Sequence, residues 1–186
     1  VRCDNEAGGR IATEHLLKRG ARRPALLTSR TGTHNLREKG YRQVLQQAGI
    51  EPVVLTVGFN TPDAERSGLI RERLDLVSGD IDAVFATDDL TAAQVIEWAS
   101  ERGLRVPEDF KVVGFDGTVA MRRALPALTT IQQPIADLAR AAVDLLVDQI
   151  GDVASSSPDD DRSDLPSQAP RVPSPMDVRL VPGRTT

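Results

Sequence analysis

The segments VPEDFKVVGFDG (residues 106–117) and PALTTIQQP (residues 126–134) decide the fold of this chain. The apolar run in the first segment predicts a short buried strand that ends at Asp116. Gly114 and Gly117 flank this acid, so we expect the backbone to turn sharply and to come close to a ligand there. A carboxylate at the carboxyl end of a parallel strand lies in the crevice where open α/β sheets bind ligands.

The rest of the chain alternates short apolar runs with stretches of helical period. Apolar residues recur three and four positions apart over residues 7–19, and Gly20 ends that pattern. The predicted strands are residues 24–28, 53–57, 83–86, 111–115 and 128–132, with a last strand at 176–181, and the predicted helices are residues 7–19, 36–48, 62–77, 90–102 and 135–150. This alternation favours an α/β fold with a parallel sheet flanked by helices.

Composition places the chain among soluble globular domains. The formal net charge of −4 argues against binding of nucleic acid by this segment, because phosphate contacts need a basic face. Cys3 is the single cysteine, which excludes an internal disulfide and fits a reducing cytoplasm. No apolar run is long enough to span a membrane, so we expect no membrane partner.

Several short motifs follow one another in an order that is typical of one protein family. They are VRCDN with Gly8-Gly9 (residues 1–9), HLLKRG followed by RRPALL (15–27), REKGY (37–41), FATDD (85–89) and GLRVPED (103–109). Together with the two segments above, this series resembles the effector-binding core of LacI/GalR-family transcriptional regulators. That core is itself similar to periplasmic sugar-binding proteins. The resemblance covers residues 1–150.

The resemblance implies a type I periplasmic-binding-protein-like fold, of which this chain holds the second lobe and part of the first. We expect residues 1–150 to form a partial effector-binding domain. Residues 151–175 are rich in Ser, Pro and Asp and predict a disordered insertion, and residues 176–186 predict the C-terminal strand and tail. We also expect a helix-turn-helix module and the first half of lobe one to precede Val1.

The family pattern implies three principal ligand contacts. Arg37 matches the family's ligand arginine, whose guanidinium forks two hydrogen bonds to sugar hydroxyls or a carboxylate; the alternative is a surface ion pair. Asp116 matches the strand-end carboxylate that accepts from sugar hydroxyls, and the alternative is a turn aspartate bonded to nearby amides. Phe59 matches an aromatic that stacks on the ligand, and the alternative is a core side chain.

Four further candidate ligand residues are polar. Thr31 and Thr33 occupy the loop before Arg37, where the family supplies hydroxyl contacts, and an ordinary loop is the alternative. Thr87 stands where many members place an asparagine or aspartate, so the family pattern leaves the identity of the ligand open. Asp4 matches a polar position near the family's hinge.

Three neighbouring polar residues have other or undecided roles. Asn5 belongs to the same polar pair as Asp4. Asp88 follows a strand and precedes a predicted helix, so a helix cap is the expected role. Gln133 lies on the crossover between the lobes, where a hinge role and a pocket role are both open.

No arrangement of residues predicts an enzyme. Asp88-Asp89 resembles the acidic pair that holds magnesium in receiver domains, but Lys111 begins its strand, whereas a receiver needs a lysine at a strand end. Of the two histidines, His15 is expected on the apolar face of a helix and His34 in a loop. Without a Ser-His-Asp arrangement, a P-loop or metal-ligand spacing, we expect neither catalysis nor a cofactor nor a metal.

Two functions remain. The first is the sensor of a cytoplasmic repressor, in which a small-molecule effector such as a sugar changes the angle between lobes and thereby the affinity of a separate module for operator DNA. The alternative is the sugar-binding protein of an ABC transporter. Family members pair through the second lobe, so we expect a homodimer, with Trp98 in its interface and internal packing of Trp98 as the alternative.

Overall fold

The computed structural model describes residues 1–29, 32–155 and 174–186. The chain divides into two compact units. The larger unit comprises Asp4–Gln133 with Val178–Thr186, and the smaller unit comprises Val1–Cys3 with Pro134–Asp177. The larger unit holds the sheet and the candidate ligand residues, so the site is built within one body.

A six-stranded sheet forms the centre of the larger unit. Its strands are β1 (Pro24–Thr28), β2 (Val53–Thr56), β3 (Ala83–Ala86), β4 (Lys111–Asp116), β5 (Thr129–Gln132) and β6 (Arg179–Val181), in the spatial order β2-β1-β3-β4-β5-β6. The first five strands are parallel, as predicted, and β6 runs antiparallel to β5. The last strand, predicted at 176–181, is shorter in the structure, where β6 covers only Arg179–Val181 and runs antiparallel to β5.

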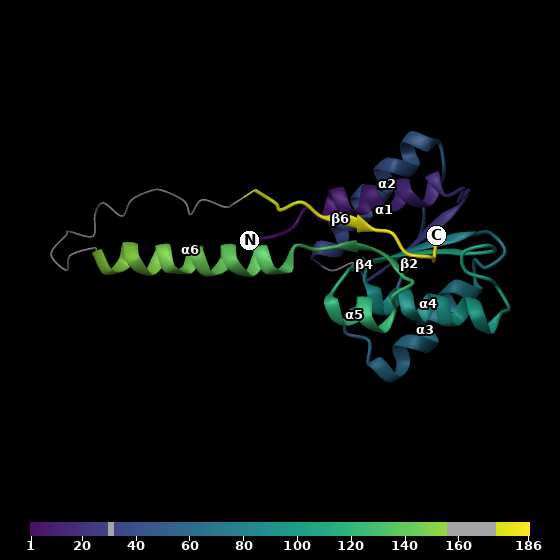
Figure 1. Cartoon of the computed structure of the whole chain (residues 1–186). Coiled ribbons are helices and arrows are strands. Elements are labelled where there is room, and N and C mark those ends of the chain that lie inside the picture. Colours follow the sequence, from purple (N-terminus) through teal and green to yellow (C-terminus); the bar gives the residue numbers. More distant parts are fainter. Residues whose placement is uncertain (30–31, 156–173) are drawn as a thin grey trace. The chain divides into compact units, whose positions relative to one another are not determined.

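Helices cover both faces of this sheet (Figure 1). The helices of the larger unit are α1 (Asn5–Lys18), α2 (Thr33–Ala48), α3 (Asp63–Asp75), α4 (Asp89–Glu101) and the short α5 (Val119–Ala124). Helices α1 and α2 lie together on one face, and α3 and α4 lie on the other. This confirms the predicted α/β class.

Trp98 packs inside the core between the sheet and helices α3 and α4. Its side chain is fully buried, and its ring meets the ring of Phe110 edge-on at a centroid distance of 5.5 Å. The indole Nε1 donates to Asp75 Oδ1 at 2.9 Å. The prediction that Trp98 lies in a dimer interface is therefore wrong, because the amphipathic face of α4 that carries it turns to the sheet.

Helices α1 and α2 approach each other closely at two glycines. A Cβ atom at Gly9 would clash with the carbonyl oxygen of Arg37, and one at Gly40 would clash with the carbonyl oxygen of Glu6. This close approach brings the backbone of Arg37 against α1. As a result, a side chain of α1 can reach the guanidinium of Arg37.

The smaller unit consists mainly of helix α6 (Ile135–Ser155). The helix predicted at 135–150 is present and continues into the segment predicted to be a disordered insertion. The rest of that prediction falls largely on residues 156–173, which lie outside the described residues. Cys3 and Met176 form an isolated parallel bridge, and the Met176 amide donates to the Arg2 carbonyl at 2.9 Å.

Within the part of the chain that the structure describes, every helix is too short or too polar to cross a membrane.

Candidate ligand-binding site

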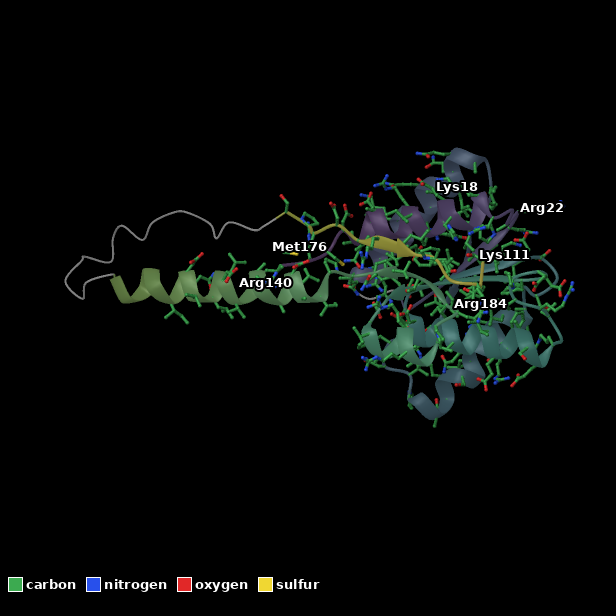
Figure 2. All side chains as sticks on the ribbon, viewed as in Figure 1. Lys18, Arg22, Lys111, Arg140, Met176 and Arg184 are labelled. Atoms are coloured by element: carbon green, nitrogen blue, oxygen red, sulfur yellow. The ribbon has the colours of Figure 1, made fainter. Side chains whose placement is uncertain are left out.

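The strand order reverses direction between β1 and β3, and the candidate site lies where these strands end. In a sheet of order 2-1-3-4-5, chain connections diverge at this point and leave a crevice at the carboxyl ends of the strands, where ligands bind. Ser29 follows β1, Thr87 follows β3, and Asp116 ends β4. Figure 2 labels Lys18, Arg22 and Lys111 at the opposite end of this unit, where the strands begin.

Arg37 is a buried cation at the centre of the site, with 4% of its surface exposed. Its Nε donates to Asn5 Oδ1 at 2.9 Å, and its Nη1 donates to the backbone carbonyl of Thr87. The guanidinium lies over the ring of Phe115, 3.6 Å from the centroid, in cation–π geometry. A charge this deep is tolerable only because these partners replace its lost hydration. The alternative of a surface ion pair is therefore wrong.

Asp116 meets Arg37 at a distance of 3.7 Å between Oδ1 and Nη1. The same oxygen accepts from the side-chain Nε2 of Gln133 at 2.7 Å. The backbone amide of Gln133 donates to the backbone carbonyl of Asp116. Burial raises the pKa of Asp116, while the nearby Arg37 and the hydrogen bond from Gln133 act in the opposite direction. Gln133, whose role the sequence leaves open, thus supports the acid directly.

His34 belongs to this cluster, although the sequence predicts it to be in a loop. Helix α2 begins at Thr33, so His34 precedes Arg37 by one turn and lies on the same helix side. His34 Nδ1 lies 2.8 Å from Ser29 Oγ and 3.0 Å from Thr87 Oγ1, which links the ends of β1 and β3. Burial, followed by the charge of Arg37, lowers the pKa of His34, which favours the neutral ring.

Asp89, like His34, is a residue of the cluster that the sequence does not predict. The sequence indicates this acid only as part of the Asp88-Asp89 pair that resembles a magnesium site. Its side chain is 2% exposed. Oδ2 accepts from the Gly117 amide at 2.9 Å, and Oδ1 accepts from Thr130 Oγ1 at 2.5 Å. Burial raises the pKa of Asp89 to about 6, against the effect of both hydrogen bonds.

Two predicted ligand residues serve as helix caps or carry backbone contacts. The Asp4 carboxylate accepts from the Ala7 amide at 2.8 Å and caps α1. Thr87 offers its backbone carbonyl to Arg37, and its own side chain is buried against His34. Neither arrangement tests ligand binding, but both hold the walls of the site in place.

Other candidates lie at the margin of the cluster. Asp88 accepts from the amide and the hydroxyl of Thr91, at 2.7 and 2.8 Å, which confirms its predicted role as a cap of α4. Thr33 is exposed as the first residue of α2, so its prediction as a loop residue is wrong. Phe59 lies in the turn after β2 with 67% of its surface exposed, so the core alternative is wrong. Thr31 lies outside the described residues.

A cavity of the larger unit lies away from this cluster. It has a volume of about 760 Å³ and is lined by residues of the loop before β4, of the segment before β5 and of the C-terminal tail. None of the residues described above lines it. We place the candidate site at the polar cluster because convergent hydrogen-bonding groups, and not volume alone, specify a polar ligand. The arrangement offers a cation, a carboxylate and an amide for hydrogen bonding.

The chain matches the family model described as "Periplasmic binding protein-like domain" over residues 13–186. It is 33% identical over 152 residues to the ribose operon repressor of Halalkalibacterium halodurans, a match that covers 81% of this chain and 45% of the repressor. The chain therefore spans about half the length of the curated relatives that it matches.

Two solved structures resemble the fold and contain a sugar. The complex of the transcriptional regulator CelR with cellobiose superposes with a TM-score of 0.80 at 30% identity, covering 99% of this chain and 53% of that one. A LacI family transcriptional regulator from Enterococcus faecium with bound ribose gives a TM-score of 0.77 at 26% identity, covering 100% of this chain and 64% of that one.

Proposed function

Because this chain belongs to the family of periplasmic binding protein-like domains, in the form that LacI-type regulators carry as their effector-binding core, we propose that it binds a sugar at the Arg37–Asp116 cluster. Binding there allosterically controls the attachment of the whole regulator to operator DNA through a separate helix-turn-helix module. The net charge of −4 supports this division of labour, since an acidic domain is a poor partner for phosphates.

The single observation that carries the proposal is the pairing of Arg37 with Asp116 at the switch point of the sheet. A forked donor and an acceptor side by side match vicinal hydroxyls, each of which both donates and accepts. Phe115 lies beneath the guanidinium, which holds Arg37 in place. The exposed Phe59, in the turn after β2, supplies an aromatic face for stacking on a sugar ring, and the exposed Thr33 supplies a hydroxyl one helical turn before Arg37.

The class of ligand follows from two of the relatives. CelR holds cellobiose and the Enterococcus faecium regulator holds ribose. We therefore propose a pentose or a glucose-based sugar as the effector. The relatives are transcriptional regulators, so a role as an ABC-transporter component is set aside. The proposal also places the protein in the cytoplasm, as a homodimer and without catalytic activity.

Thermal unfolding in the presence of D-ribose and cellobiose tests this function. A ligand present at 100 times its dissociation constant stabilises the folded state by about 2.7 kcal/mol, which raises the melting temperature by several degrees. We expect one of these sugars to raise the melting temperature of the wild type and to leave that of Asp116→Ala unchanged. A sugar-dependent rise of equal size in Asp116→Ala would remove Asp116 from the site.

Ser67→Ala is a matched control, because Ser67 lies on α3 and bonds to Gln94, away from the cluster. This variant should keep the full response to the sugar. Loss of the response in Ser67→Ala as well would indicate that the assay reports general stability and not the site.

A further inference from the structure

The backbone of Asp116 adopts a conformation that L residues seldom occupy. Its φ is +114°, and it is the only described non-glycine residue with positive φ. Such a conformation is energetically unfavourable and persists only where surrounding contacts hold it. Gly117 follows with φ +58°, in the left-handed region that glycine adopts freely. Something must therefore hold the turn that aims Asp116 at Arg37.

Gln133 bonds Asp116 itself, and Asp89 supplies a second contact to the turn, from α4. Its carboxylate accepts from the Gly117 amide at 2.9 Å and from the Thr130 hydroxyl at 2.5 Å. The first bond fixes the residue immediately after Asp116, and the second ties the same carboxylate to β5. Asp89 thus joins the start of α4, the end of β4 and the neighbouring strand.

The fold leaves room for this carboxylate at Gly114. A Cβ atom at Gly114 would clash with Asp89 Oδ1. Gly114 has no positive φ, so its side chain is missing for reasons of space and not of backbone freedom. The glycine before Asp116 therefore accommodates the acid that holds the turn after it.

Capping of α4 does not account for Asp89. The neighbouring Asp88 already caps this helix through the Thr91 amide and hydroxyl. A second carboxylate that is 2% exposed and bonded to Gly117 and Thr130 carries a desolvation cost that its place in the first turn of α4 does not require. The geometry requires a different role for it.

We propose that Asp89 is a positioning residue, which holds the Asp116–Gly117 turn so that the Asp116 carboxylate faces Arg37 and the sugar. This deepens the proposed function and rests on it, since the residue acts on the ligand only through Asp116.

Three variants separate positioning from simple stability. Asp89→Ala removes the acceptor for the Gly117 amide and should weaken sugar binding by about tenfold or more. Asp89→Asn keeps an acceptor for Gly117 and turns a donor toward Thr130 Oγ1, so it should rescue binding to within about threefold of the wild type. Asp88→Asn is the matched control, because it removes the adjacent charge while asparagine remains a good cap.

Binding is measured by NMR titration of the chain with D-ribose and cellobiose. In an Asp116→Asn background, Asp89→Ala should cause no further loss of affinity, because the residue through which it acts is already disabled. An undiminished additional loss in that background would overturn the proposal. Equal losses in Asp89→Ala and Asp88→Asn would also overturn it.

Hydrogen exchange of the Gly117 amide gives a reading that needs no sugar. We expect this amide to be protected in the wild type and in Asp89→Asn, and to exchange rapidly in Asp89→Ala, while the core amide of Val95 in α4 stays protected. Protection of Gly117 in a folded Asp89→Ala would overturn the proposal. If Asp89→Ala does not fold, Asp89→Leu replaces it, because leucine fills a similar volume and also lacks an acceptor for the Gly117 amide; unchanged protection of Gly117 there would overturn the proposal. A wild type that binds neither D-ribose nor cellobiose would contradict the proposed function. Gly117 exchange would still decide whether Asp89 holds the turn.

Discussion

Arg37 and Asp116 differ in how far the fold depends on them. Arg37 is buried, contacts Asn5, Thr87 and Phe115, and would leave a cavity and unpaired polar groups if truncated. The sequence places neither residue on an apolar stripe and so predicts that the fold tolerates the loss of either. For Arg37 we expect instead that truncation destabilises the fold, because its guanidinium fills the space above Phe115. Asp116 is the residue to truncate in binding experiments, since Arg37 keeps its other partners.

Asp89 should make the free energy of unfolding depend on pH. Burial raises its pKa from 3.8 to about 6 in the folded protein, so the folded state binds this proton more tightly than the unfolded chain. The resulting stabilisation is fully present below pH 3.8 and is lost as the pH rises through about 6. Relative to Asp89→Asn, the wild type should therefore lose about 2 kcal/mol of stability between pH 4 and pH 7.

Urea unfolding of both proteins at these two pH values measures that difference. Asp109→Asn, which alters an exposed acid paired with Arg105 and keeps Asp89, is the control, and its difference in stability from the wild type should be the same at both pH values. A constant difference between wild type and Asp89→Asn across the pH range would show that Asp89 is not the group that titrates.

Helices and strands in which the apolar spacing repeats over several residues can be predicted from the sequence. Contacts between residues far apart in the sequence cannot. The strand at 24–28 matches β1, and the helix at 36–48 matches most of α2, because apolar spacing directly encodes a buried face. The six-residue α5 is too short to show a period. The family pattern predicts Arg37 and Asp116 as ligand residues, whereas His34 and Asp89 act through partners 53 and 41 residues away, at Thr87 and Thr130.

Helix α4 should depend on Trp98 for packing and not for assembly. Trp98 is fully buried against Phe110 and bonded to Asp75, so Trp98→Ala should lower the free energy of unfolding by about 3–5 kcal/mol. Its apparent mass by light scattering at a temperature where it stays folded should equal that of the wild type. A Trp98→Ala variant that is as stable as the wild type but self-associates more weakly would show that Trp98 contributes to an interface.

At the scale of the whole molecule, the two compact units of the chain carry different elements. The larger unit carries the sheet and the candidate site, and α6 lies in the smaller unit. Several apolar side chains of α6, among them Val143, Leu146 and Ile150, are more than half exposed. The chain spans about half the length of its curated relatives, so the control of DNA binding remains a proposal about the whole regulator.

The chain itself should not bind DNA tightly. Its formal net charge is −4, and electrostatic attraction to phosphates supplies most of non-specific affinity. Gel-shift titration at physiological salt should show no complex at submicromolar protein, with an operator-like duplex or with a mixed-sequence one. A complex that forms at submicromolar protein and weakens steeply with salt would contradict this prediction. It would show that a local basic surface binds phosphates despite the negative net charge.

The most direct test of the Arg37–Asp116 site is to locate the bound sugar on the chain. Backbone amide shifts of the chain should be mapped during titration with D-ribose and with cellobiose. The largest shifts should occur at Arg37 in α2 and at Thr87 and Asp116, at the carboxyl ends of β3 and β4. Shifts confined to residues 124–128 and 183–186, around the cavity at the other end of the sheet, would contradict this prediction.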